Sequence, residues 1–283
     1  MTSEEALDAV REYAQTGSQH AFARIVRAHV ALVYASALRQ VRGDVHLAED
    51  VTQAVFIVLS RKARSIRDGT IISGWLVKTA RFCAHDALKR HFRQSRHERE
   101  AAAMRPTSYQ PSTASALELE ELLPHLDEAL SHLPTRDRDA IVLRFLEQRS
   151  MRQVSKALGT TEEAAKKRVA RAVGKLRHSF IRTGSPLSVP AVEGALRAYV
   201  PPEAPPALAT TVLASIFSAG KASVASVAIA DGAMQMMRST KWMLTAVLGG
   251  TAVLIVLIPL IWWQVHLTAP PQTDTPTQQT VSK

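Results

Sequence analysis

The residues best suited to chemistry in this sequence form a run of cations beyond the middle of the chain. Seven Lys and Arg residues, with no Asp or Glu, lie between Lys166 and Arg182. Apolar residues recur through the run at helical spacing, at Ala165, Val169, Ala172, Val173 and Leu176. This spacing predicts a helix with one buried and one cationic face. Because the charge is of one sign and not interleaved, it favours a polyanionic partner over an ordinary solvated surface.

The segments before and within this run have the spacing of a helix-turn-helix. Residues 137–147 and 151–158 are predicted to be its first two helices, and Gly159 suits a left-handed turn position. Thr160 and Glu163 are expected to form a capping box that opens the third helix. In such a motif this helix enters the DNA major groove. The sequence therefore predicts DNA binding with a large, salt-dependent phosphate contribution.

Other kinds of chemistry find no support among the 283 residues. The single cysteine, Cys83, excludes internal disulfides and multi-cysteine zinc sites, and it is expected to be a buried small hydrophobe. His85, His91 and His97 do not share a helix face, which argues against a histidine metal site. The sequence has no Gly-rich phosphate loop, nucleophile elbow or carboxylate pair. We therefore expect no enzyme activity, no catalytic residue, no metal and no cofactor.

The elements that must position these residues are helices, and the predicted fold is all-α. Residues 1–182 hold 30 Lys and Arg against 21 Asp and Glu, whereas the remainder holds 5 against 4. The basic part is expected to bind an anionic partner, and the nearly uncharged part is expected to lie in apolar surroundings. The predicted parts are a three-helix domain at 15–95, a linker at 96–116, a helix-turn-helix domain at 117–182, a Pro- and Ala-rich connector at 183–241, a membrane span at 242–263 and an outer tail at 264–283.

The predicted span is 22 residues long and carries no charge, which is enough to cross a hydrocarbon core of about 30 Å. Trp242 lies at one end and Trp262 and Trp263 at the other, as interfacial anchors do. Cations precede the span, and the first residues contain no secretory signal, so the bulk of the chain is expected in the cytoplasm. The alternative is a buried core helix. A weaker apolar stretch, 207–230, is expected to be an interfacial or packing helix and not a second span.

Three stretches carry a resemblance to a known family. They are AFARIVRAHVALVYASALRQVRGDVHLAEDVTQAVFIVLSRKA, GWLVKTARFCAHDALKR and LPTRDRDAIVLRFLEQRSMRQVSKALGTTEEAAKKRVARAVGKLR. In order and spacing, the chain resembles bacterial RNA polymerase sigma factors of the extracytoplasmic-function (ECF) type. The resemblance implies a region 2 helical bundle and a region 4 helix-turn-helix of the winged-helix-like class. The apolar C-terminal helix resembles a membrane-anchored subset of that family.

The resemblance also implies surfaces for core polymerase and for a second protein. The helix with AEDVTQ would bind the clamp helices of the largest polymerase subunit through Glu49, Asp50 and Gln53, expected on one exposed face. Alternatively, Glu49 and Asp50 lie in a first helical turn and complement its dipole. The flap of the second-largest subunit and an anti-sigma protein are further implied partners.

The resemblance assigns promoter DNA to two helices. The helix at 75–93 would bind and melt the −10 element, and the loop at 65–73 before it would select bases. Its cations are Lys78, Arg81, Lys89, Arg90 and Arg93. The helix at 161–177 would bind the −35 element, although Glu163-Ala164-Ala165 replaces the common Gly-Thr-Val. Its residues are Thr161, Glu162, Lys166 and Lys167 at base edges, and Arg168 and Arg171 on phosphates.

Two functions of different classes are consistent with these features. The favoured one is an ECF sigma factor that binds core polymerase, recognises both promoter elements and melts DNA, tethered to the membrane for regulation. The alternative is a membrane-anchored helix-turn-helix regulator that binds duplex DNA without being a polymerase subunit. A third, weaker possibility is a membrane adaptor whose basic surface binds anionic lipid. The order of the two domains and the AEDVTQ helix favour the first.

Overall fold

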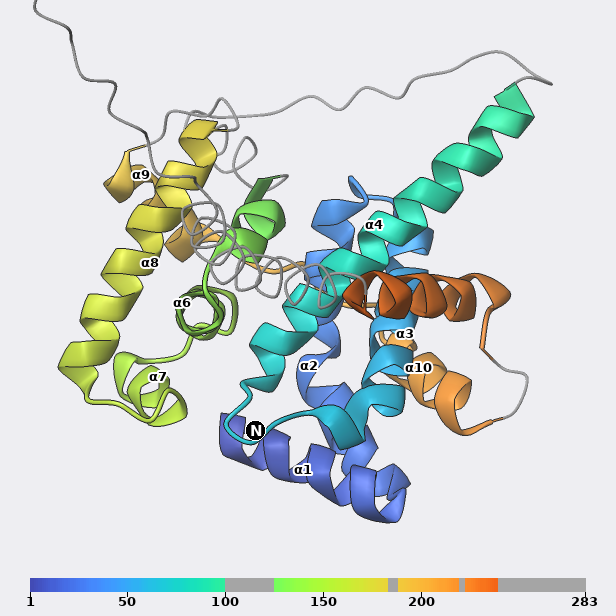
Figure 1. The fold of residues 1–283 in the computed structure, drawn as a ribbon, viewed down its shortest axis with the longest axis horizontal. Coiled ribbons are helices and arrows are strands. Elements are labelled where there is room, and N and C mark those ends of the chain that lie inside the picture. The colour runs from blue at the N-terminus through green and yellow to red at the C-terminus, as the bar shows by residue number, and fades with distance from the viewer. Residues whose placement is uncertain (100–124, 183–187, 219–221, 239–283) are drawn as a thin grey trace, which may run out of the picture. The chain divides into compact units, whose positions relative to one another are not determined.

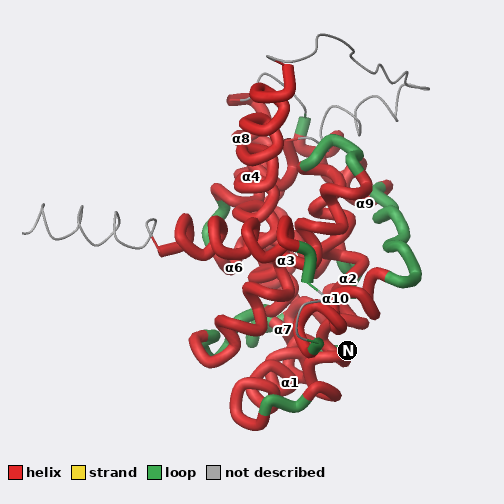
Figure 2. The backbone as a smooth tube through the Cα atoms, turned by 90° about the vertical axis from the view of Figure 1, so that its right-hand side faces the viewer, coloured by secondary structure: helices red, strands yellow, loops and turns green. Residues whose placement is uncertain are grey.

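The computed structural model describes residues 1–99, 125–182, 188–218 and 222–238, and all regular elements in these ranges are helices (Figures 1 and 2). The all-α prediction is confirmed for this part of the chain. The predicted span at 242–263, the outer tail, and the linker beyond residue 99 lie outside the described residues. Residues 1–236 and 237–283 are separate units, and nearly all of the described residues belong to the first.

The first 99 residues, here the N-terminal module, contain α1 (Ser3–Thr16), α2 (Gln19–Gln40), α3 (Val45–Lys62), the short η1 (Ala63–Ser65) and α4 (Ile72–Arg99). Helices α2, α3 and α4 pack against one another, as the three-helix prediction requires. Phe22, Ile25, Phe56, Leu59 and Leu76 are fully buried between them. The buried positions recur every three or four residues, so apolar periodicity determines which face of each helix turns inward.

Helix α1 was not predicted, although Thr2 and Glu5 form a capping-box pattern at its start. The Thr2 hydroxyl accepts a hydrogen bond from the Glu5 N–H at 3.2 Å, and the Thr2 N–H donates to Glu5 Oε2 at 2.9 Å. This capping box satisfies two backbone groups that a helix start leaves open. Leu7 and Val10 are buried, and Gly17 ends the helix at a φ of 71°. The acidic, polar N-terminus is therefore an amphipathic helix.

Helix α2 is long and apolar enough to cross a membrane, with 22 residues and a mean hydropathy of 1.3. However, 56% of its most apolar stretch is buried inside the protein. An apolar helix that other helices cover is what the core of a helical bundle requires. Among the described residues, α2 is the one helix that is long and apolar enough to cross a membrane.

The helix-turn-helix module comprises a helix at residues 125–132, then α6 (Thr135–Ile141), η2 (Val142–Leu146), α7 (Met151–Ala157) and α8 (Glu162–Arg182). The five apolar residues predicted to face inward from α8 are all buried. Val169, Ala172, Val173 and Leu176 share a core with Leu126, Leu130 and Ile141, whereas Ala165 packs in a smaller cluster. The predicted helix-turn-helix is therefore present, and its third helix is positioned by its apolar face.

The segment η2 is a π-helical turn, which continues α6 where a single helix over 137–147 was predicted. A π-turn holds one more residue than an α-turn, so it changes the direction of the side chains beyond it. Leu143 packs in a small cluster with Ile71, Val154 and Ala165. Phe145 and Leu146 instead enter the main core of the module. The wide turn thus supplies side chains to two clusters.

The predicted connector contains helices α9 (Val189–Ala198) and α10 (Leu208–Phe217) and a further helix at residues 224–238. We call residues 188–238 the extension. Val192 and Leu196 of α9 are buried in the core of the helix-turn-helix module. The stretch 207–230, predicted as one packing helix, is two helices, because α10 ends at Phe217 and the next begins beyond Ser223.

A buried ion pair joins the two modules. Arg39 of α2 donates from Nε to Asp127 Oδ2 at 2.8 Å and from Nη2 to Asp127 Oδ1 at 3.1 Å. The Ser36 hydroxyl donates to the same carboxylate at 2.6 Å. Arg39 also hydrogen-bonds the Tyr199 hydroxyl, just past α9. Burial would lower the pKa of Arg39, but Asp127 outweighs it and raises that pKa. Arg39 therefore stays charged, and each of its three guanidinium nitrogens has a hydrogen-bond partner.

Replacing Asp127 by Ala should lower the free energy of unfolding by about 3–5 kcal/mol, because the buried Arg39 charge then loses its partner. Chemical denaturation followed by circular dichroism measures this change. Glu128→Ala is the control, since Glu128 is 3.8 Å from Arg81 and both side chains are partly exposed. That neighbouring change should cost less than about 1 kcal/mol. Equal effects of the two substitutions would contradict a special role for Asp127.

Candidate nucleic-acid and protein interfaces

The turn of the helix-turn-helix is built as predicted, but the third helix is capped differently. Gly159 adopts a φ of 60°, the left-handed conformation expected of it. Helix α8 begins at Glu162, and the hydroxyl of Thr161, not Thr160, accepts from the Ala164 N–H at 3.2 Å. The predicted box of Thr160 and Glu163 is therefore wrong, because the helix starts one residue later. Thr161, expected at a base edge, also serves as the cap.

Two cations of α8, here the paired group, bind Asp137 of α6, and three others, here the exposed group, do not. Lys166, Lys167 and Arg171 are exposed. Arg168 Nη1 instead lies 3.0 Å from Asp137 Oδ1, and Lys175 Nζ lies 2.6 Å from Asp137 Oδ2. The exposed group lies outside the module core and suits a groove contact, although Lys166 Nζ lies 3.5 Å from Glu162 Oε1 one turn away. Arg168, predicted to contact phosphate, is held by α6 in this structure.

Asp137 is the anchor of the paired group. It is buried, which by itself would raise its pKa, but hydrogen bonds and charge from Lys175 and Arg168 outweigh burial and lower the pKa. Asp137 therefore stays ionised and orients two cations of the DNA-facing helix. Sequence reasoning missed this residue, because Asp137 precedes Lys175 by 38 positions and the contact is tertiary.

The cations predicted for the −10 element lie along α4. Lys78, Lys89, Arg90 and Arg93 are exposed, and Arg81 is half-buried. Arg81 lies 3.8 Å from Glu128 of the helix-turn-helix module, and Arg90 pairs with Asp86 one turn away. The row of cations therefore extends from the module contact at Arg81 to the exposed end of α4 at Lys89 and Arg93.

Helices α4 and α6 meet at Gly74. A Cβ atom at this position would overlap the carboxylate of Asp139, so the two helices approach closely and the Asp139 side chain would have to shift for any larger residue. Asp139 Oδ1 is buried and has no hydrogen-bond partner among the described residues. Burial raises the pKa of Asp139 to about 6, although the charges of Arg138 and Lys78 oppose the shift. The contact between the modules thus holds a carboxylate that titrates near neutral pH.

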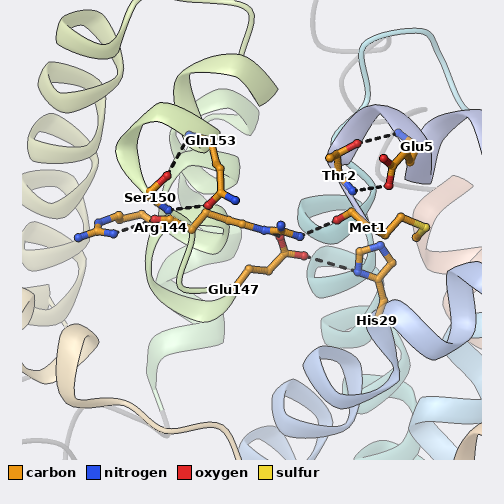
Figure 3. A network of polar contacts seen from close by, with 9 residues as sticks. Met1, Thr2, Glu5, His29, Arg144, Glu147, Ser150 and Gln153 are labelled. Carbon is orange, nitrogen blue, oxygen red and sulfur yellow. Dashed lines mark hydrogen bonds and ion pairs between the residues drawn. The ribbon is translucent and has the colours of Figure 1, made fainter.

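A polar network forms a further contact between the modules (Figure 3). His29 Nδ1 of α2 lies 3.5 Å from Glu147 Oε1, at the end of the π-turn. Arg149 donates to the Met1 carbonyl at 2.8 Å and lies 3.2 Å from Glu147 Oε2. Burial would raise the pKa of Glu147, but His29 and Arg149 outweigh it and lower the pKa. The network places an ionised carboxylate against the start of the chain.

A cavity of about 440 Å³ lies beside this network. Gly69, Thr70 and Ile71 line it from the loop predicted to select bases, and Lys156 and Gly159 line it from the helix-turn-helix. The loop therefore faces the other module in this structure.

The residues predicted to bind polymerase lie on α3, but they do not form one exposed face. Gln53 is only 7% exposed, so its predicted exposure is wrong. Glu49 and Asp50 are half-buried. The Ser223 hydroxyl of the extension donates to Asp50 Oδ1 at 2.7 Å. The face is covered from a position 173 residues away, which local periodicity cannot reveal.

The helix-dipole interpretation of Glu49 and Asp50 is also wrong. Helix α3 begins at Val45 and has no acidic residue in its first turn. Its N-cap is Asp44, whose carboxylate accepts from the Leu47 N–H at 3.0 Å. Glu49 and Asp50 lie in the second turn, where the dipole effect has fallen off.

No group of three or more His, Cys, Asp or Glu side chains in the described ranges is arranged to hold a metal ion. Cys83 is fully buried, as predicted, and burial raises the pKa of its thiol well above its usual value. A buried thiol of this kind is inert.

Two family descriptions match this chain in the order of its modules. Residues 25–94 match sigma-70 region 2, and residues 125–176 match sigma-70 region 4. The RNA polymerase sigma factor CarQ of Myxococcus xanthus is 33% identical over 162 residues, which are 57% of this chain and 90% of CarQ. The ECF RNA polymerase sigma factor SigE of Mycolicibacterium smegmatis is 30% identical over 173 residues, 60% of this chain and 66% of SigE.

This chain belongs to the ECF group of sigma-70 RNA polymerase sigma factors. The probable RNA polymerase sigma factor RfaY of Xanthomonas campestris pv. campestris is 31% identical over 173 residues, which are 60% of this chain. The match spans 43% of RfaY's own length. In this sigma factor, α2–α4 correspond to region 2, and α6–α8 correspond to region 4.

Asp139→Asn should remove a pH-dependent loss of stability. Because the folded pKa is raised, the folded state holds the proton more tightly than the unfolded chain between about pH 4 and pH 6. The unfolding free energy contributed by Asp139 therefore falls as pH rises through this window, by on the order of 3 kcal/mol. The variant should match the wild type near pH 4 and be more stable at pH 7.

Denaturant titrations at several pH values measure this difference. Asp68→Asn is the control, because the Asp68 side chain is 90% exposed. A difference between Asp139→Asn and wild type that stays flat from pH 4 to pH 7 would contradict the burial of an ionisable carboxylate at this contact.

Proposed function

We propose that this sigma factor binds core RNA polymerase through α3, recognises the −10 element with α4 and the −35 element with α8, and promotes DNA melting. The observation that carries the proposal is the joint presence of regions 2 and 4 in one chain, each with exposed cations on one helix. A regulator that only binds duplex DNA needs the helix-turn-helix alone.

The physical properties of α8 suit duplex DNA. Lys166, Lys167 and Arg171 are exposed on a helix whose opposite face is buried, so they are presented on a rigid support. Near the N-terminus of the helix, Glu162, Lys166 and Lys167 contact bases. Arg171 contacts a phosphate of the DNA backbone. Release of counterions from several phosphates makes the binding strongly salt-dependent.

The properties of α4 suit a single strand that has left the duplex. Lys89 and Arg93, near the exposed end of the helix, supply positive charge for the DNA backbone. Phe92 lies between them in the sequence and is 58% exposed. An exposed aromatic ring beside cations is suited to stacking an unpaired base. The loop before α4 supplies the remaining contacts with bases.

The proposal includes a membrane tether and further protein partners. The charge-free stretch 242–263 spans the cytoplasmic membrane with residues 1–241 in the cytoplasm, supported by its length, its terminal Trp residues and the preceding cations. Within core polymerase, the partners are the clamp helices of the largest subunit and the flap of the second-largest. An anti-sigma protein is a further partner, by family resemblance.

In vitro transcription with core polymerase and a genomic DNA library tests the main proposal. Asp50→Arg should abolish core-dependent initiation, because a cation replaces a carboxylate that faces a basic partner. Lys167→Glu should retain core binding and lower specific initiation by about tenfold or more, since one good base contact is worth about 1–3 kcal/mol.

The controls carry the same charge changes away from the interfaces. They are Asp8→Arg on α1 and Arg197→Glu on α9, both exposed. Both should initiate like the wild type. Initiation by Asp50→Arg at the wild-type level would contradict the assignment of α3 as the polymerase-binding helix. Duplex binding without any core-dependent initiation by the wild type would favour the regulator that is not a polymerase subunit.

Membrane fractionation tests the tether. The full chain expressed in bacteria should remain in the membrane pellet after alkaline extraction. Replacing Leu254 and Leu257 by Arg should move it to the soluble fraction, because each charge near the centre of a span costs about 2.5–3.5 kcal/mol. Ser282→Arg, in the predicted outer tail, is the control. A wild-type chain found in the soluble fraction would contradict the tether.

A further inference from the structure

The extension covers the part of the N-terminal module on which the proposed polymerase contact depends. Helix α10 packs against α2 and α3, and the helix at 224–238 lies across α3 and α4 (Figure 1). Two polar contacts attach that second helix near opposite ends of α3, Ser223 to Asp50 and Asp231 to Arg61. The described surface of α3 is therefore already engaged by residues of the same chain.

We call the surface of the N-terminal module that α10 and the helix at 224–238 cover their seat. The part of the seat under α10 is apolar and well packed. Leu208 is 3% exposed and Val212 is fully buried. The Phe217 ring meets Phe22 edge-on at 5.8 Å between centroids and Tyr13 at 6.2 Å. Such burial contributes most of the attachment, because apolar side chains gain when they leave water. Edge-to-face ring pairs add geometric specificity to it.

The helix at 224–238 also presents one buried face. Ser226, Ile229, Ala230 and Ala233 are buried, at the spacing of a helix that packs along one side. At Gly232 a Cβ would overlap the Asp86 carboxylate of α4, so the two helices approach closely. The buried face and the close approach at Gly232 show that this helix fits the surface on which it packs.

The polar contacts differ in what they do. Arg61 and Asp231 are about half exposed, so their ion pair adds little stability. Ser223 is more informative: its hydroxyl donates to Asp50 and accepts from the Ser226 N–H at 2.9 Å. The N-cap of the covering helix thus uses the carboxylate assigned to polymerase. A basic partner that binds Asp50 therefore competes with Ser223 for this carboxylate.

We propose that α10 and the helix at 224–238 compete with core polymerase for α3, so that the chain binds polymerase weakly until these helices leave their seat. The inference rests on the proposed function, because it takes α3 to be the polymerase-binding helix. Polymerase then binds only the fraction of molecules in which the seat is empty, and its apparent affinity is lowered by that fraction. The second of these helices ends at Arg238, four residues before the predicted span.

Substitution within the seat tests the competition. In the full chain in detergent, Val212→Asp should bind core polymerase about tenfold or more tightly than the wild type, because a buried carboxylate disfavours the seated state. Val224→Asp is the matched control, with the same change in the same segment at a side chain that is 88% exposed. It should bind like the wild type. Equal affinities of all three proteins would overturn the proposal.

A reversible cross-link tests the same point without emptying the seat. Arg61→Cys and Asp231→Cys, joined by a cleavable bismaleimide, hold the segment on α3, and the buried Cys83 does not react. The joined chain should bind core polymerase at least about tenfold more weakly than the same chain after cleavage. Equal binding before and after cleavage would overturn the competition. If neither form binds polymerase, and Val212→Asp does not either, the proposed function fails, and the inference with it.

Discussion

The arrangement of the described residues depends on one buried guanidinium. Arg39 lies in region 2, yet its partners are Asp127 of region 4 and Tyr199 of the extension, so three parts of the chain meet at one side chain. A buried charge is tolerated only when a carboxylate and hydrogen bonds replace the lost water. Geometry of this kind is satisfied in one docking position. It therefore specifies how the modules meet more than it adds to stability.

The contacts around that anchor explain which surfaces are available. Asp139 and Glu128 of region 4 face cations of α4, and Ser223 faces α3. Some polar groups on the helix surfaces proposed for DNA and polymerase thus already have partners within the chain. A ligand must offer more than these internal partners before it displaces them, which favours a multivalent partner such as a polymerase–promoter assembly over an isolated contact.

Local sequence patterns predicted the helices well, because burial of one face at a period of 3.6 is a local property. The inward residues of α8 and the turn at Gly159 follow from it directly. Where two local solutions compete, the pattern could not choose: Thr160 and Thr161 are both good caps, and the structure uses the second. Gln53 is buried although its polar side chain favours exposure. The anchoring role of Asp137 depends on partners far along the chain, so periodicity carries no signal for it. The start of α1 was available in the Thr2–Glu5 pair and was overlooked.

The π-turn at Val142–Leu146 bears on how relatives of this chain should be aligned. A π-turn adds one residue without lengthening the path of the helix, so it rotates the residues beyond it by about 100° compared with an uninterrupted α-helix. A relative with a regular helix here presents the same faces to its core with one residue fewer. An alignment without a single-residue gap between 141 and 147 would then place α7 and α8 one position out of register, and would assign base-reading roles to the wrong side chains.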